Sequence, residues 1–144
     1  MTRAQLEQLL VNAHKGWMGV ASMSITYGGS NVDLNDPIAR ALLDADYTVA
    51  NIMSVTSAEV VAVAVGDVMK VVEFARIHLL ETILGNLTGV DTTVGPRSER
   101  LSQLADRVQA LLDKLLAHAS LVWGYGVQPL TCGVYDLATA EVEA

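Results

Sequence analysis

Apolar residues recur at helical spacing along most of the chain. Between residues 2 and 15 they occupy one face, and Thr2 and Gln5 stand at the spacing of a capping box. This pattern predicts a short amphipathic helix that ends at Gly16. Its apolar positions are Leu6, Leu9, Leu10 and Ala13.

A second helix is predicted near residues 37–52. Asp36 can cap its start, and Pro37 suits the first helical position because that position needs no backbone N–H. Apolar residues then follow at helical spacing, namely Ile38, Ala41, Leu42, Ala45 and Val49.

The longest apolar run extends over residues 59–87, after a plausible cap at Ser57, and predicts a long helix. Apolar residues surround most of its circumference, so this helix is expected either at the centre of the domain or against other copies of the chain. The alternation of Val61, Val63 and Val65 could instead form a strand, and Gly66 could break or start the helix; helix is the preferred interpretation. Both readings of residues 60–65 stay open. The main stripe is Val68, Val71, Val72, Ala75, Leu79, Ile83 and Leu87.

A loop and a last amphipathic helix are predicted next. The glycine and proline content of residues 85–96 indicates the loop, and Ser98 then caps a helix through about Leu121. The stripe expected to be buried consists of Leu101, Leu104, Val108, Leu111, Leu115 and Val122.

Two segments lack helical periodicity. Residues 18–35 contain the alternating Met23, Ile25 and Tyr27 and then a glycine-rich turn, which predicts an extended arm or a marginal strand followed by a loop. Residues 124–144 are predicted to be an extended C-terminal arm. Large side chains at its root and along it are costly to leave in water, so they are the candidate partner-binding residues: Trp123, Tyr125, Leu130 and Tyr135.

Together these elements predict an all-α fold. A chain of 144 residues is long enough for one hydrophobic core without a disulfide or a metal. The expected architecture is a small helical bundle of about four helices in residues 1–123. An extended N-terminal segment belongs to that domain, and the extended C-terminal arm, residues 124–144, follows it.

Composition narrows the function classes. Apolar residues make up 51% of the chain but aromatic residues only 5%, which favours close helix packing over a roomy aromatic pocket. The net charge of -7 has the wrong sign for binding a nucleic-acid backbone. No apolar run is long enough to span a bilayer, and the start lacks the pattern of a signal peptide. The single Cys132 allows no internal disulfide, which favours a reducing, cytoplasmic interior.

The sequence contains no recognisable catalytic or metal-binding motif. The three histidines, His14, His78 and His118, fall on different predicted helices without zinc-ligand spacing. His78 and Glu81 are three residues apart and are expected to form a local hydrogen bond or ion pair. Cys132 has no histidine near it in sequence and is expected to be a small buried apolar residue. The chain is therefore predicted to have no cofactor, no metal site and no enzymatic activity.

Residues 71–115, VVEFARIHLLETILGNLTGVDTTVGPRSERLSQLADRVQALLDKL, resemble the head-tail adaptor (connector) proteins of long-tailed bacteriophages and prophages. That resemblance implies a structural virion protein, made in the bacterial cytoplasm, that forms a ring, dodecameric by analogy. The ring would bind the portal protein through an extended arm and would receive the tail-side connector or tail proteins. DNA would pass through it without specific binding, and it would perform no catalysis.

Two other classes of function stay open at this stage. A non-viral, cytoplasmic helical module that binds or regulates other proteins would share the bundle but would have no reason to form a large ring. An enzyme would have to use His78, Glu81 or Cys132. Only the types of these residues suggest catalysis, since they form no catalytic motif in the sequence.

Overall fold

The computed structural model describes residues 1–89 and 95–126. Over those ranges its regular elements are all helices, joined by irregular connections, and it has no strand. This confirms the predicted all-α class. Two short 3-10 turns accompany the α-helices: η1, Val32–Leu34, and η2, Val65–Asp67. The α-helices are α1, Arg3–Val20; α2, Asn35–Asp44; α3, Ser57–Val61; α4, Val68–Gly89; and α5, Gly95–Trp123.

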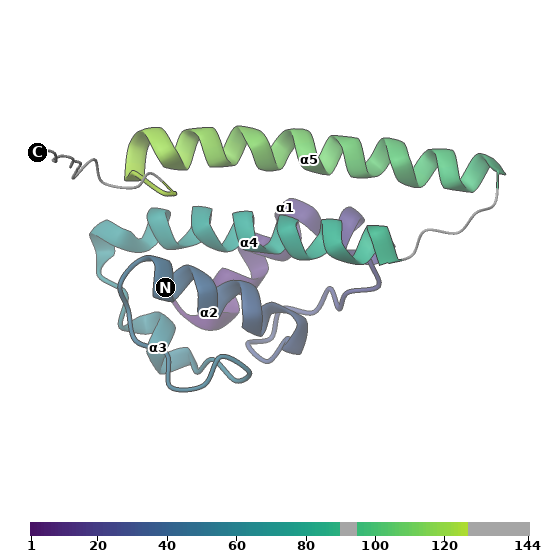
Figure 1. Ribbon diagram of the computed structural model, residues 1–144. Coiled ribbons are helices and arrows are strands. Elements are labelled where there is room, and N and C mark those ends of the chain that lie inside the picture. The colour runs from purple at the N-terminus through teal and green to yellow at the C-terminus, as the bar shows by residue number, and fades with distance from the viewer. Residues whose placement is uncertain (90–94, 127–144) are drawn as a thin grey trace, which may run out of the picture.

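Helix α4 is the centre of the bundle. It packs against α1, α2 and α5, and α5 runs back along it in the opposite direction (Figure 1). Val71, Ala75, Leu79 and Ile83 are completely buried as a result. This apolar helix was expected either at the centre of the domain or against other copies of the chain. The structure places it at the centre of a single chain.

Helix α1 begins as predicted and ends later than predicted. The Thr2 side chain accepts from the Gln5 amide and the Gln5 side chain accepts from the Thr2 amide, which completes the capping box. The prediction that Gly16 ends the helix was wrong. An interior glycine costs a helix about 1 kcal/mol, and burial of Met18 one half-turn further on outweighs that cost.

Residues 21–31 form an irregular connection rather than a strand. A buried network joins this connection to α1 and to the segment before α3. The Arg3 guanidinium donates to Glu7 Oε2 (2.8 Å), to Asn35 Oδ1 (2.6 Å), to the Asn31 carbonyl (2.7 Å) and to the Val55 carbonyl. The alternation of Met23, Ile25 and Tyr27 therefore does not indicate strand pairing here.

Glu7 holds the other side of the same network. Its carboxylate accepts from the backbone amides of Gly29 (2.7 Å) and Asn31 (3.1 Å) as well as from Arg3. Gly29 has a φ of +99°, in the left-handed region that glycine adopts without strain. The connection is thus fastened to α1 by a fully buried charge.

The second and third predicted helices are shorter than expected. Helix α2 starts at Asn35 rather than Pro37 and ends at Asp44 rather than near residue 52. The run over residues 59–87 divides into α3, η2 and α4. Thr56, not Ser57, caps α3, in a capping box with Glu59. Residues 60–65 are the end of α3 and the turn that follows it, so they are not a strand.

The side of α5 that faces α4 is displaced from the predicted stripe. Helix α4 continues past the predicted loop start to Gly89, and α5 begins at Gly95 instead of Ser98. Val108, Leu112 and Ala119 are buried, whereas the predicted Val122 is half exposed. Leu104, Leu111 and Leu115 lie at the edge of the contact and are partly buried.

This displacement predicts a difference between two adjacent leucines. Leu112→Ala is expected to lower the free energy of unfolding by about 2 to 4 kcal/mol, because it leaves a cavity between α4 and α5. Leu111→Ala, which removes a partly exposed side chain, should cost roughly half as much. Urea melts followed by circular dichroism measure both values. Equal losses would show that the two leucines are equally buried in solution.

Candidate functional site

Helix α5 ends in a tight turn at the predicted root of the C-terminal segment. Gly124 has a φ of +68° and Gly126 a φ of +73°, both left-handed values that suit glycine. The amides of Gly124 and Tyr125 donate back to the carbonyls of Ser120 (3.1 Å) and Ala119 (3.2 Å). The turn places the Tyr125 ring beside α2 and α4.

The Tyr125 ring is held by its neighbours. Its centroid lies 4.6 Å from that of Phe74 in α4, at an interplanar angle of 37°, and its hydroxyl lies 3.3 Å from His78 Nε2. Burial raises the pKa of Tyr125, and the Asp44 carboxylate raises it further through its charge and a hydrogen bond. The hydroxyl therefore stays protonated and can donate.

His78 joins three parts of the bundle at this point. Its Nε2 lies 2.5 Å from Asp44 Oδ2 in α2, and its Nδ1 lies 2.9 Å from Glu81 Oε1 in its own helix. Both ring nitrogens can donate to these carboxylates only when the imidazole carries its second proton. The predicted local pair of His78 and Glu81 is confirmed. It belongs to a larger cluster that also includes Asp44 and Tyr125.

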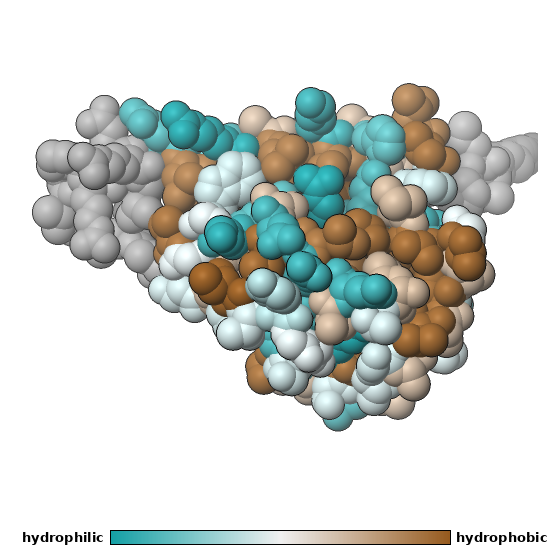
Figure 2. Space-filling model, turned by 180° about the vertical axis from the view of Figure 1, so that it is seen from behind, coloured by the Kyte–Doolittle hydropathy of each residue, from teal (hydrophilic) through white to brown (hydrophobic). Residues whose placement is uncertain are grey.

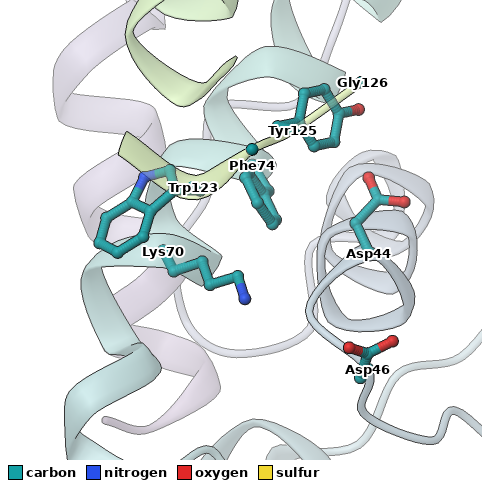
Figure 3. A pocket seen from close by; sticks show the side chains of 8 residues that line it. Asp44, Asp46, Lys70, Phe74, Trp123, Tyr125 and Gly126 are labelled. Carbon is teal, nitrogen blue, oxygen red and sulfur yellow. The ribbon is translucent and has the colours of Figure 1, made fainter. Parts of the chain in front are cut away.

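A cavity of about 520 Å³ opens beside this cluster, between the end of α2, the start of α4 and the end of α5 (Figure 3). Asp44 and Asp46 lie on one side of it. The Lys70 ammonium lies 6.0 Å from the centre of the Phe74 ring, within reach of a cation–π contact. The cavity is lined by Asp44, Asp46, Lys70, Phe74, Trp123, Gly124, Tyr125 and Gly126.

The three histidines of the chain have different partners, and only His78 belongs to this site. Within the described residues no group of three His, Cys, Asp or Glu side chains is placed to hold a metal ion. The other two histidines are used elsewhere: His118 pairs with Glu73 (2.7 Å) and His14 accepts from Arg76 (3.2 Å). The contacts of the Phe74 and Tyr125 rings and the hydrogen bonds of His78 fix the position of the turn after α5.

Two of the four predicted partner-binding residues lie at this root. Trp123 and Tyr125 are both partly buried against the core, whereas Leu130 and Tyr135 lie outside the described residues. Cys132 lies outside them as well. No helix within residues 1–89 and 95–126 combines the length and hydropathy needed to cross a membrane.

Sequence reasoning missed the residues that hold Tyr125. Asp44 is 34 positions from His78, and His78 is 47 positions from Tyr125. No local pattern connects residues so far apart, and only the packing of α2 and α5 on α4 brings them together.

Comparison with other proteins adds no family. No protein-family model, no curated protein and no solved structure matches the chain.

Proposed function

We propose that this protein is a structural adaptor, in which a helical body presents its C-terminal segment to a partner protein. On the resemblance of residues 71–115, the adaptor is a subunit of a head-tail connector ring between the portal and the tail of a bacteriophage or prophage virion. The observation that carries the proposal is the fixed root. Hydrogen bonds, ring contacts and two left-handed glycines hold the chain up to Gly126.

A fixed root favours attachment through the segment that follows it. Binding through a chain segment costs conformational entropy, and the cost is lower when the first residues of the segment are already in place. The sequence beyond Gly126 provides Leu130 and Tyr135 as apolar anchors. Root and anchors together suit a docking arm.

Exposed apolar residues at the same end of the bundle also support partner binding. The start of α4 and the end of α5 lie together because these helices run in opposite directions (Figure 1). Val65 and Met69 are 93% and 68% exposed there, and Leu121 is 86% exposed. Figure 2 shows brown surface at the end of the molecule where α4 begins. Apolar side chains that cluster on a surface commonly mark a protein interface.

Net charge fits passage of DNA past the protein. The net charge of -7 repels a phosphate backbone, so the chain suits a channel wall that must not retain DNA.

A second candidate is a non-viral helical module that binds or regulates other proteins. The observation that favours it is that most apolar residues of α4 are buried within one chain. The outward side of α5 is also largely polar and exposed, with Gln103, Asp106, Gln109, Asp113 and Lys114. Neither helix requires a ring of copies to be stable.

Removal of residues 127–144 tests the adaptor proposal. The truncated chain is expected to keep its helical circular dichroism, because the bundle core lies within the described residues, and to lose co-sedimentation with a candidate portal ring. Tyr135→Ala should weaken attachment in the full chain. Tyr27→Ala, at a 47% exposed tyrosine on the irregular connection, is the matched control and should not.

Two outcomes would decide against parts of the proposal. Undiminished binding of the truncated chain would show that residues 127–144 are not the docking arm. Particle mass and symmetry, from light scattering and negative-stain microscopy, separate the two candidates. A ring supports the connector, whereas a monomer or dimer at all concentrations supports the module.

A further inference from the structure

His14 is a buried histidine placed against a cation. It lies on the side of α1 that faces α4, is 3% exposed, and its Nε2 accepts from Arg76 Nε at 3.2 Å. A ring nitrogen that accepts a hydrogen bond carries no proton, so the imidazole is neutral here with its proton on Nδ1. That N–H is buried and has no hydrogen-bond partner in the part of the chain that the structure describes. The Trp17 ring stacks on the His14 imidazole, with 5.9 Å between the two ring centroids.

Within the described residues, no carboxylate forms an ion pair with Arg76 that would offset its positive charge. Arg76 is the charged group that α4 presents to His14. Glu73, one turn earlier in α4, is committed to His118. Glu59 of α3 is committed to the amides of Ala50 and Thr56. On α1 itself, Lys15 is exposed and adds a further positive charge.

We infer that the second half of α1, residues 11–20, is an acid-sensitive flap, which the protonation of His14 releases from α4. A second proton would sit on Nε2 and point at the Arg76 N–H, so an attractive contact becomes a repulsion between two buried cations. The first half of α1 is retained by Arg3 and Glu7, whose network does not include His14. Release therefore starts at the end that carries Met18, a completely buried side chain.

The direction of the pH effect follows from the histidine. Burial, and then the Arg76 charge, lower the pKa of His14 from 6.5 to about 4. The released histidine takes up its proton near pH 6.5, whereas the packed one resists protonation until about pH 4. Contact between α1 and α4 is thus strongest above pH 6.5 and weakens steadily as the pH falls from 6.5 to 4. Over this interval the opening equilibrium should rise about 100-fold.

Amide hydrogen exchange of the intact chain between pH 7 and pH 4, corrected for the intrinsic rate, tests this inference. Opening of residues 11–20 is expected to rise about 100-fold, while residues of α5 stay protected. His14→Gln keeps an acceptor for Arg76 but cannot titrate, so its opening should not depend on pH in this interval. Arg76→Gln should give a smaller rise than the native chain, since the pKa of His14 then lies nearer its ordinary value.

His118→Gln is the matched control, because His118 is a half-exposed histidine of α5 that pairs with Glu73 rather than with a residue of α1. It should respond to pH as the native chain does. An equal acid response in His14→Gln would overturn the inference, and so would a parallel loss of protection in α5. The measurement uses the chain alone, so its outcome is independent of whether the chain docks on a portal.

Discussion

Glu7→Ala is expected to lower the free energy of unfolding by about 3 to 5 kcal/mol. Glu7 is 0% exposed and accepts three hydrogen bonds, from Arg3 and from the amides of Gly29 and Asn31. Its removal leaves the Arg3 guanidinium, itself only 4% exposed, without a counter-charge in the interior. Two backbone amides lose their acceptor at the same time. Urea denaturation followed by circular dichroism measures the loss.

The same chain offers an exposed ion pair as a control. Asp36 and Arg40 are also one helical turn apart, but their side chains are 47% and 57% exposed. Asp36→Ala should therefore cost about 0.5 kcal/mol or less. A loss below about 1 kcal/mol for Glu7→Ala would mean that water reaches the network in solution. The loss of stability in Glu7→Gln should fall between those of Glu7→Ala and Asp36→Ala, because the glutamine amide keeps one acceptor oxygen but not the charge.

Phe74→Ala is the second change with a large expected effect, a loss of about 3 to 5 kcal/mol. Phe74 is 1% exposed, and it lies where α4 supports the turn after α5. Its removal opens a cavity in the core and also takes away the ring on which Tyr125 rests. The turn at Gly124 should loosen together with the core, so amide exchange at Tyr125 is expected to quicken more than exchange at Val108.

Phe74→Leu separates these two effects. Leucine fills most of the volume, so the loss of stability should fall to about 1 to 2 kcal/mol, whereas the aromatic contact with Tyr125 is absent in both variants. If Phe74→Leu protects the Tyr125 amide as well as the native chain does, the ring contact is not what holds the root. Full stability of Phe74→Ala would contradict its place in the core.

Local physical chemistry determined the helical class and much of the helix pattern. The capping box at Thr2 and Gln5 and the apolar periodicity of residues 68–87 act within a few residues of each other, so the sequence alone reveals them. Helix ends were less predictable. Whether Gly16 stops a helix, or whether α2 continues past Asp44, depends on what the next turn can bury against other elements.

The candidate site was decided by tertiary structure. Trp123 and Tyr125 stood out in the sequence because large side chains beside glycines are costly to expose. The residues that hold Tyr125 did not stand out in the sequence. Asp44 and His78 belong to different helices and come together only when α2 packs on α4. The sequence likewise placed His14 on a helix, but its lowered pKa arises from burial and from Arg76, 62 positions away. Charge, burial and hydrogen bonding between distant residues depend on distances in space, and these exist only once the helices have packed.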